Sequence, residues 1–408
     1  MRGTVSRMQM CVRRLSRAFT CPPATLGSAI LGTVYLSFMF SAMAGPFLPH
    51  YFGEKLSMVG SSSFYGFFAL ANLIVAYNPT HVALQWWLMI ASAAFLGVSA
   101  SFLWISQASY LTQLSVLYSK FLDIPKVSSV GFFNGLFYSI FKFSGITGNL
   151  ISSIVLGYFT WSTTTLFAFY SLLSFSGTAL LCFVPTLPPA PLDDDDDDVT
   201  EATRLLHPAT PLSTLRSLVT LAIDPRMLVL APTMILNGIQ QAFLSGEFTS
   251  NFIRESLGSA SIGYVFVLVG LVSVTSSFVF GKLADRFGPL CGQLVCFSVL
   301  LAAYLLCYVA HVTKCDGHWS LVLVVAVLLS MGDCSSSTLV NVVLGQEFPS
   351  DTVNAFSVFR VYHAGGTSFS FFYFPSLSFH GRLVLLGVWI VLSVASYMVY
   401  YTRFRRVQ

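Results

Sequence analysis

Three charged residues lie well inside long apolar stretches of the sequence: Lys142, Asp333 and Arg360. A charge at the centre of a bilayer costs roughly 2.5–3.5 kcal/mol on insertion scales, so each side chain should face a partner or a cavity. Asp333 and Arg360 lie on consecutive stretches of opposite direction, within a turn or two of the same depth. They are candidates either for a buried ion pair that joins two helices or for a ligand- or proton-binding site.

Lys142 has no obvious acidic partner nearby in the sequence. Its ammonium group could be satisfied by an anionic ligand, by backbone carbonyls, or by the side chain of Asn149 further along the same stretch. Gln107 is another polar candidate for the same kind of cavity. These residue types predict binding or pairing and no bond-making chemistry.

Enzymatic sites are not indicated by the remaining motifs. The stretch Ser330–Asp333 is similar to the Gly-x-Gly-Asp motif of intramembrane aspartyl proteases, but that chemistry needs two carboxylates sharing a site, and no second Asp lies mid-stretch. We find no phosphate loop, nucleophile elbow or zinc spacing. The eight cysteines are scattered without a CxxC pair. We therefore predict no enzymatic activity, no metal and no cofactor.

A sorting pattern follows an acidic run. Glu201, Leu205 and Leu206 fit the acidic-x-x-x-Leu-Leu pattern that clathrin adaptors read, close behind the unbroken run Asp193–Asp198. Self-repulsion makes such a run an extended spacer; a basic partner or a divalent cation is the alternative. The pattern predicts sorting to an endosomal, lysosomal or vacuolar membrane, with the plasma membrane as the alternative.

The composition predicts a polytopic membrane protein. The 408 residues are 55% hydrophobic and only 9% charged, against about 25% charged residues in soluble domains. This excludes a soluble globular protein, a disordered chain and a nucleic-acid binder. The apolar stretches are too long and continuous for barrel strands, so we expect helices. At about 20 residues per crossing, about eleven spans are predicted: 26–49, 57–77, 83–107, 130–157, 162–184, 226–246, 259–281, 290–310, 319–345, 353–378 and 382–402.

The stretches fall into two groups separated by an acidic segment rich in proline. Lys and Arg are more frequent on the segments that share a side with this linker, which predicts that the linker is cytoplasmic. The predicted domains are a basic N-terminal tail (1–25), a bundle of five spans (26–184), a disordered cytoplasmic linker (185–225), a bundle of six spans (226–402) and a basic cytoplasmic tail (403–408).

A loop in the second group carries a recognisable motif. Gly281, Asp285, Arg286 and Gly288 combine turn glycines with an acid and a base, and the stretch is similar to the cytoplasmic loop motif of the major facilitator superfamily. A degenerate counterpart, Phe52–Lys55, lies in the first group. The resemblance implies two helical bundles related by a repeat, with any substrate site near mid-membrane between them.

A second repeat lies on the penultimate span of each half. Ser139–Lys142, followed by Gly145 and Gly148, parallels Ser357–Arg360, followed by two further glycines. In the first half, however, the loop motif falls one span too early, so that half apparently lacks its first helix. Residues 1–25 contain five arginines and cannot supply it. We expect either a start further upstream or a variant whose N-terminus lies outside.

Eight short stretches, spread over most of residues 26–378, match the pattern of one known family: Leu103–Thr112, Gly131–Gly135, Gly148–Ser153, Gln241–Phe243, Gly246–Thr249, Gly332–Asp333, Ala355–Ser357 and Phe371–Tyr373. Together they resemble the Unc (uncoordinated-ninety-three) family, a branch of the major facilitator superfamily. This sequence departs from the family pattern at Ala108, where Gly is usual, and at Lys142, where Gln is usual. The resemblance implies that residues 26–49 match the second helix of the family.

Members of the Unc family are described as potassium-channel regulators or as trafficking partners of other membrane proteins. The resemblance therefore implies regulation or trafficking of a partner membrane protein such as a potassium channel. The alternative is a secondary transporter that moves a small, perhaps anionic, solute past Lys142 and Arg360. A third interpretation is a structural paralogue that has lost transport. The expected partners are the lipid bilayer and either a membrane protein or a small molecule, and no nucleic acid.

Replacing both Leu205 and Leu206 with Ala should move the protein from internal membranes to the cell surface. Adaptor pockets bury both leucines, and one buried leucine contributes roughly 1.5–3 kcal/mol. Surface biotinylation of the wild type and the double variant measures the shift. Equal surface fractions would remove the sorting pattern from consideration.

Overall fold

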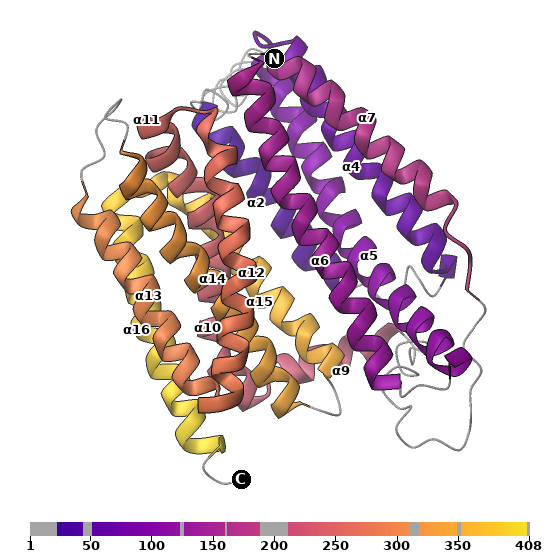
Figure 1. The fold of residues 1–408 in the computed structure, drawn as a ribbon, viewed down its shortest axis with the longest axis vertical. Helices are drawn as coiled ribbons and strands as arrows, with labels where there is room; N and C mark the ends of the chain where they lie inside the picture. The colour runs from indigo at the N-terminus through magenta and orange to yellow at the C-terminus, as the bar shows by residue number, and fades with distance from the viewer. Residues whose placement is uncertain are drawn as a thin grey trace, which may run out of the picture.

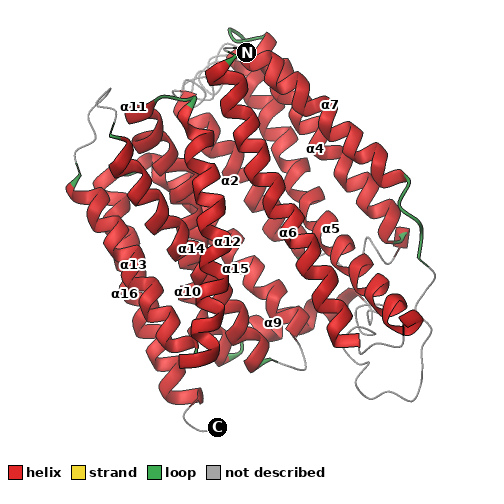
Figure 2. Cartoon of the chain, in the orientation of Figure 1, coloured by secondary structure: helices red, strands yellow, loops and turns green. Residues whose placement is uncertain are grey.

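The computed structural model of the protein describes residues 23–43, 51–122, 126–159, 161–187, 211–310, 318–348 and 352–405. These residues form helices joined by turns, with no β-strand among them (Figure 2). Eight of their helices are long and apolar enough to cross a membrane. The predicted all-α membrane architecture is therefore confirmed, whereas the count of eleven spans stays a prediction.

The helices before residue 188 form the N-terminal bundle, in which α4 packs against α5 and α7, and α2 packs against α5. The sequence places the end of one span at residue 107, but α5 continues to Leu122. Its extension is stabilised by Ser109 and Gln113, which donate hydrogen bonds of 3.1 and 2.5 Å to the Glu54 carboxylate of α4. The elements are α2 (Pro23–Ala42), α4 (Glu54–Tyr77), α5 (Val82–Leu122), α6 (Lys126–Ser153), the π-helical η1 (Ile154–Tyr158) and α7 (Thr163–Cys182).

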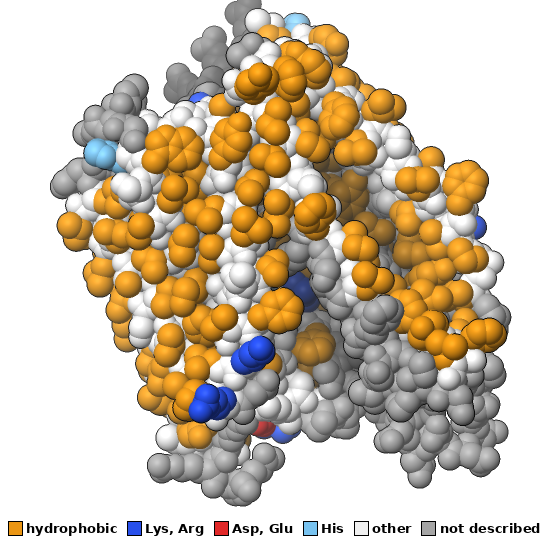
Figure 3. Space-filling view, viewed as in Figure 1, with side chains coloured by type: hydrophobic (Ala, Val, Ile, Leu, Met, Phe, Trp, Pro, Cys, Tyr) orange, Lys and Arg blue, Asp and Glu red, His pale blue; other side chains and the backbone are white. Residues whose placement is uncertain are grey.

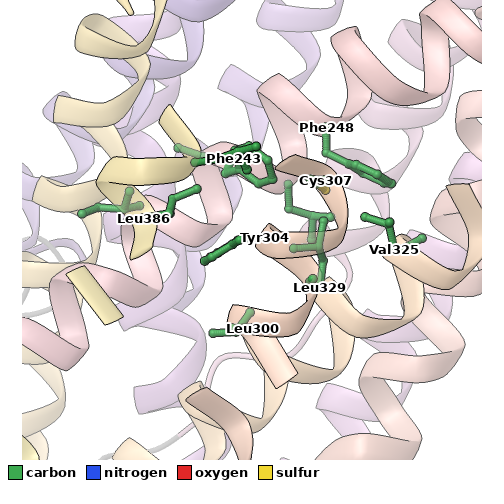
Figure 4. Packing of buried hydrophobic residues seen from close by; sticks show 14 of the residues in the cluster. Phe243, Phe248, Leu300, Tyr304, Cys307, Val325, Leu329 and Leu386 are labelled. Atoms are coloured by element: carbon green, nitrogen blue, oxygen red, sulfur yellow. The ribbon is translucent and has the colours of Figure 1, made fainter. Parts of the chain in front are cut away.

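The C-terminal bundle surrounds a dense apolar core. Phe243, Tyr304, Leu329 and Leu386 converge on this core from four different elements (Figure 4). Such packing holds the bundle together as one unit, since lipid gives helices little hydrophobic reason to associate. Its elements are α10 (Pro225–Ala242), η3 (Phe243–Ile253), α11 (Arg254–Leu257), α12 (Ser261–Phe287), α13 (Pro289–Val309), α14 (Trp319–Glu347), α15 (Thr352–Tyr373), η4 (Phe374–Ser376), α16 (Phe379–Tyr400) and η5 (Tyr401–Arg405).

Two helix pairs join the bundles, which lie side by side in Figure 1: α2 packs against α15, and α6 against α12. In the first pair, Ser368 donates a hydrogen bond of 2.9 Å to the carbonyl of Gly32. In the second pair, Ser153 donates one of 2.7 Å to the carbonyl of Ala260. We call the two ends of the molecule the α11 end and the α9 end. Ala260 lies in the short turn between α11 and α12, so the second contact lies at the α11 end.

The last part of the predicted linker is helical. Residues 185–225 are predicted to be disordered, but α9 spans Pro211–Ala222. Leucines at 215, 218 and 221 share one face of this helix, and Leu218 is buried against the C-terminal bundle. Tyr362 of α15 donates a hydrogen bond of 2.9 Å to the carbonyl of Ala222. The prediction failed for residues 211–222 because the Pro- and Asp-rich composition before them dominates the segment.

The two loop motifs share a backbone feature. Gly53 immediately precedes α4 with φ 77°, and Gly288 immediately precedes α13 with φ 83°. Only glycine adopts this left-handed region without steric cost. The N-terminal and C-terminal bundles therefore enter corresponding helices through the same kind of turn.

Replacing Gly263 with Ala should destabilise the contact between the bundles. A Cβ at Gly263 would lie 2.2 Å from the carbonyl oxygen of Asn149 on α6, and such overpacking costs about 1–3 kcal/mol. We expect a lower Tm in detergent. Gly387→Ala is the matched control, because no atom lies within 4 Å of its Cβ and alanine favours a helix. Equal Tm values for the two variants would contradict the tight crossing.

Candidate functional site

A group of polar side chains, which we call the central polar cluster, lies where α2 meets the C-terminal bundle. It consists of Tyr35, Gln241, Asp333 and Arg360. The Gln241 side-chain amide donates a hydrogen bond of 2.7 Å to the Tyr35 hydroxyl. The charges of Asp333 and Arg360 both act on the same hydroxyl through space. The cluster therefore combines two charges with two hydrogen-bonding groups at the boundary between the bundles.

Arg360 is exposed although it lies near the middle of α15. Its guanidinium carbon lies 5.7 Å from the centroid of the adjacent Phe359 ring. Figure 3 shows a hollow between the bundles with a Lys or Arg side chain recessed in it, while apolar side chains cover most of the surrounding face. An exposed guanidinium with five N–H donors is suited to binding a carboxylate or a phosphate.

The predicted ion pair between Asp333 and Arg360 is absent from the ion pairs of the described residues. Arg360 instead packs on an aromatic ring at the open side, where its charge stays solvated. Asp333 is half-buried on α14, and its charge acts on Cys296 and Tyr304 of α13. The two residues thus contribute to one cluster without forming the direct contact that the sequence allowed.

A buried hydrogen-bond network lies behind the cluster. The Tyr304 hydroxyl donates to the side-chain carbonyl of Gln240, and the Gln240 amide donates to the carbonyl of Leu329 at 3.5 Å. Gln240 and Tyr304 are almost fully buried. Because buried polar atoms are costly unless they are paired, this network fixes α10 against α13 and α14 beside the cluster.

The other predicted cavity residues lie on the N-terminal bundle. Lys142 belongs to α6, but its side chain lies outside the described residues. Asn149 donates its side-chain amide to the carbonyl of Gly145 on its own helix at 2.8 Å. Gln107 is half-buried on α5. The roles of these three residues in a cavity stay predictions.

The loop and sorting motifs are only partly described. Arg286 is exposed near the end of α12, and its guanidinium carbon lies 5.4 Å from the centroid of the Phe287 ring. Gly281 lies in open space on the same helix. The side chain of Asp285 lies outside the described residues, as do all of Glu201, Leu205 and Leu206.

Sequence reasoning missed one buried ion pair. Glu247 of η3 accepts a charged hydrogen bond from Arg382 of α16, and the two side chains are only 10% and 13% exposed. Asn251 donates a second hydrogen bond of 3.0 Å to the same carboxylate oxygen. Both charges lie near the predicted outer ends of their spans, where solvation is the simpler expectation. The sequence signal that could have found this pair is that the two span ends carrying Glu247 and Arg382 are predicted on the same side of the membrane.

A second charged group ties helices together at the α9 end. Arg226 lies 3.3 Å from the Asp224 carboxylate and donates a hydrogen bond of 3.3 Å to the carbonyl of Glu347 on α14. Partial burial acts to raise the pKa of Asp224, but hydrogen bonds from Arg226 and its charge outweigh burial and hold that pKa below its usual range. Arg226 thus links the start of α10 to the end of α14.

A resident metal finds no support in the part of the chain that the structure describes. No group of three or more His, Cys, Asp and Glu side chains there could hold a metal ion. The polar groups of the central cluster are instead an arginine, an amide, a phenol and one carboxylate. This set can bind and orient a small polar or anionic molecule.

Comparisons with solved structures support the fold. The protein resembles the xylose transporter XylE from E. coli in a partially occluded, inward-open conformation, with a TM-score of 0.63, 14% identity, and coverage of 95% of this chain and 90% of the transporter. It resembles the nucleoside transporter NupG with a TM-score of 0.62 and 11% identity, covering 95% and 92% of the two chains. Both neighbours have the major facilitator fold that the loop motif predicts.

Comparisons with known sequences reach across nearly the whole chain. UNC93-like protein 3 of Arabidopsis thaliana is 27% identical, over 89% of this chain and 76% of its own length. The bovine protein unc-93 homolog A is 28% identical, over 93% and 87%. The putative potassium channel regulatory protein unc-93 of Caenorhabditis elegans is 26% identical, over 64% and 40%. The profile described as "Ion channel regulatory protein UNC-93" matches residues 25–398, and the chain therefore belongs to the UNC-93 family.

Proposed function

We propose that the protein is a regulatory or trafficking partner of another membrane protein, and that this partner is an ion channel. The observation that carries the proposal is the match of residues 25–398 to a family described as ion channel regulatory proteins. A relative named as a putative potassium channel regulator makes a potassium channel the first partner to test. The sorting pattern at Glu201, Leu205 and Leu206 supports a trafficking role.

Co-expression with a panel of potassium channels tests this proposal. We expect the current density or the surface amount of at least one channel to change relative to the control cells, and affinity capture to recover that channel with the protein. Cells that express a multi-pass protein of another family at the same level are the control. Unchanged currents and surface amounts across the panel, with no channel captured, would contradict channel regulation.

A second candidate function is transport of a small anionic solute. Arg360 supports it, because an exposed guanidinium near the middle of an interface helix has no structural task among the described ion pairs. The similarity to solved transporters shows the fold alone and leaves the solute open. The solute class follows from the cluster itself: a carboxylate or phosphate would contact Arg360, with Tyr35 and Gln241 available as hydrogen-bonding groups.

Replacing Arg360 with Gln should weaken binding of such an anion about tenfold or more, because a hydrogen bond to a charged group contributes roughly 1.5–3 kcal/mol. Uptake of a panel of radiolabelled small carboxylates and phosphates into proteoliposomes measures the effect. Arg360→Lys keeps the charge and should retain part of the uptake.

The same variant separates the two candidate functions. If the protein only regulates a channel, wild-type and Arg360→Gln proteoliposomes will show the same background uptake, and the variant will still alter channel currents. If it is a transporter, uptake by the wild type will exceed that of empty vesicles and will fall in the variant.

A further inference from the structure

The Glu247–Arg382 ion pair connects three elements at the α11 end of the C-terminal bundle. Arg382 of α16 pairs with Glu247 of η3 and also donates a hydrogen bond of 2.7 Å from Nε to the carbonyl of Phe374, where α15 passes into η4. Asn251, which also lies on η3, donates a hydrogen bond to the Glu247 carboxylate. The pair thus joins η3, the end of α15 and α16.

The segment that carries Glu247 has an uncommon conformation. The π-helical η3 runs over eleven residues, Phe243–Ile253, whereas most π-helical segments are single-turn bulges within α-helices. The backbone N–H of Arg254, just after η3, donates to the carbonyl of Thr249, five residues earlier, and the Thr249 side-chain hydroxyl donates a hydrogen bond of 3.1 Å to the carbonyl of Leu244. Because a long π-helix is unfavourable by itself, contacts from outside the segment must hold it in this register.

η3 also contacts the boundary between the bundles. A Cβ at Gly246, the residue before Glu247, would lie 3.0 Å from the ring of Phe371 on α15. That ring stacks on Tyr35 of α2, with 6.2 Å between centroids and 16° between planes. Tyr35 in turn accepts a hydrogen bond from Gln241, which lies on α10 just before η3. A continuous series of contacts therefore leads from the ion pair to α2.

We propose that the Glu247–Arg382 ion pair is a lock that holds η3 in its π-helical register and thereby keeps the two bundles in contact at the α11 end. With the pair intact, Gly246 lies beside Phe371 and supports the stacking of Phe371 on Tyr35. When the pair is broken, η3 can return to the α-helical register, which rotates Gly246 away from Phe371. The lock operates in the same way whether the protein regulates a channel or transports a solute.

A reporter of closure is available at the same end of the molecule, at the contact between α6 and the start of α12. Ser153→Cys and Ala260→Cys replace two residues that already touch across the boundary. We would measure the rate of disulfide formation under copper phenanthroline oxidation in membranes, by mass-tagging the remaining free thiols. Each single cysteine replacement alone gives the background from the native cysteines.

In this reporter protein we expect Glu247→Gln and Arg382→Gln each to slow disulfide formation about fivefold or more. Glu255→Gln is the matched control, since Glu255 lies on the adjacent α11 and is exposed. It makes the same chemical change outside the lock and should leave the rate unchanged. A similar slowing by Glu255→Gln would show a general effect of charge and overturn the proposal.

Two milder variants decide the question if the first two do not fold. Arg382→Lys keeps the charge but loses the paired geometry of the guanidinium. Asn251→Ala leaves both charges of the pair in place and removes the hydrogen bonds of the Asn251 amide, including the one to the Glu247 carboxylate. We expect both to slow disulfide formation, with the larger effect for Arg382→Lys. Folded variants that all react at the wild-type rate would reduce the pair to a local stabilising contact and overturn the proposal.

Discussion

At three helix crossings a glycine brings one backbone directly against the next: Gly97 of α5 against α2, Gly238 of α10 against α15, and Gly263 of α12 against α6. Helices in lipid gain little from the hydrophobic effect on associating, so they depend on such close packing and on hydrogen bonds across the contact. The first two crossings involve α2 and α15, the helices that carry Tyr35 and Arg360. Gly97 lies against Val34, the neighbour of Tyr35, and Gly238 lies against His363, about one turn from Arg360, so these close approaches help to position the central polar cluster.

The sequence was sufficient for the fold because its strongest signals act locally. Long apolar stretches must become helices in a membrane, where every backbone polar group needs an internal partner. The glycines before α4 and α13 were likewise visible within the two loop motifs. What failed was the extent of α5 and the presence of α9, because both depend on distant contacts: Glu54 receives hydrogen bonds from α5, and Leu218 is buried against the other helices.

For charged residues, too, the sequence indicated where each residue lies along its span but not which residue it contacts. Their rarity in apolar stretches made Asp333 and Arg360 easy to find, and in the structure the charges of both act through space on the Tyr35 hydroxyl. Whether the two pair directly could not be decided from the sequence, since helix depth fixes height along the membrane but leaves the direction of each side chain open. Glu247 and Arg382 show the reverse case: they lie near span ends, where solvent was the expected partner, and yet they pair in a buried site.

Two arginines of the C-terminal bundle, Arg382 and Arg360, differ in how their donors are used. Arg382 is largely buried, and a carboxylate and a backbone carbonyl already occupy its donors; removing either partner would leave a buried charge, which is strongly destabilising. Arg360 is exposed beside an aromatic ring and forms no ion pair with another residue that the structure describes. Residues of the same type therefore serve different purposes, because stability requires satisfied donors whereas binding requires donors that a ligand can still reach.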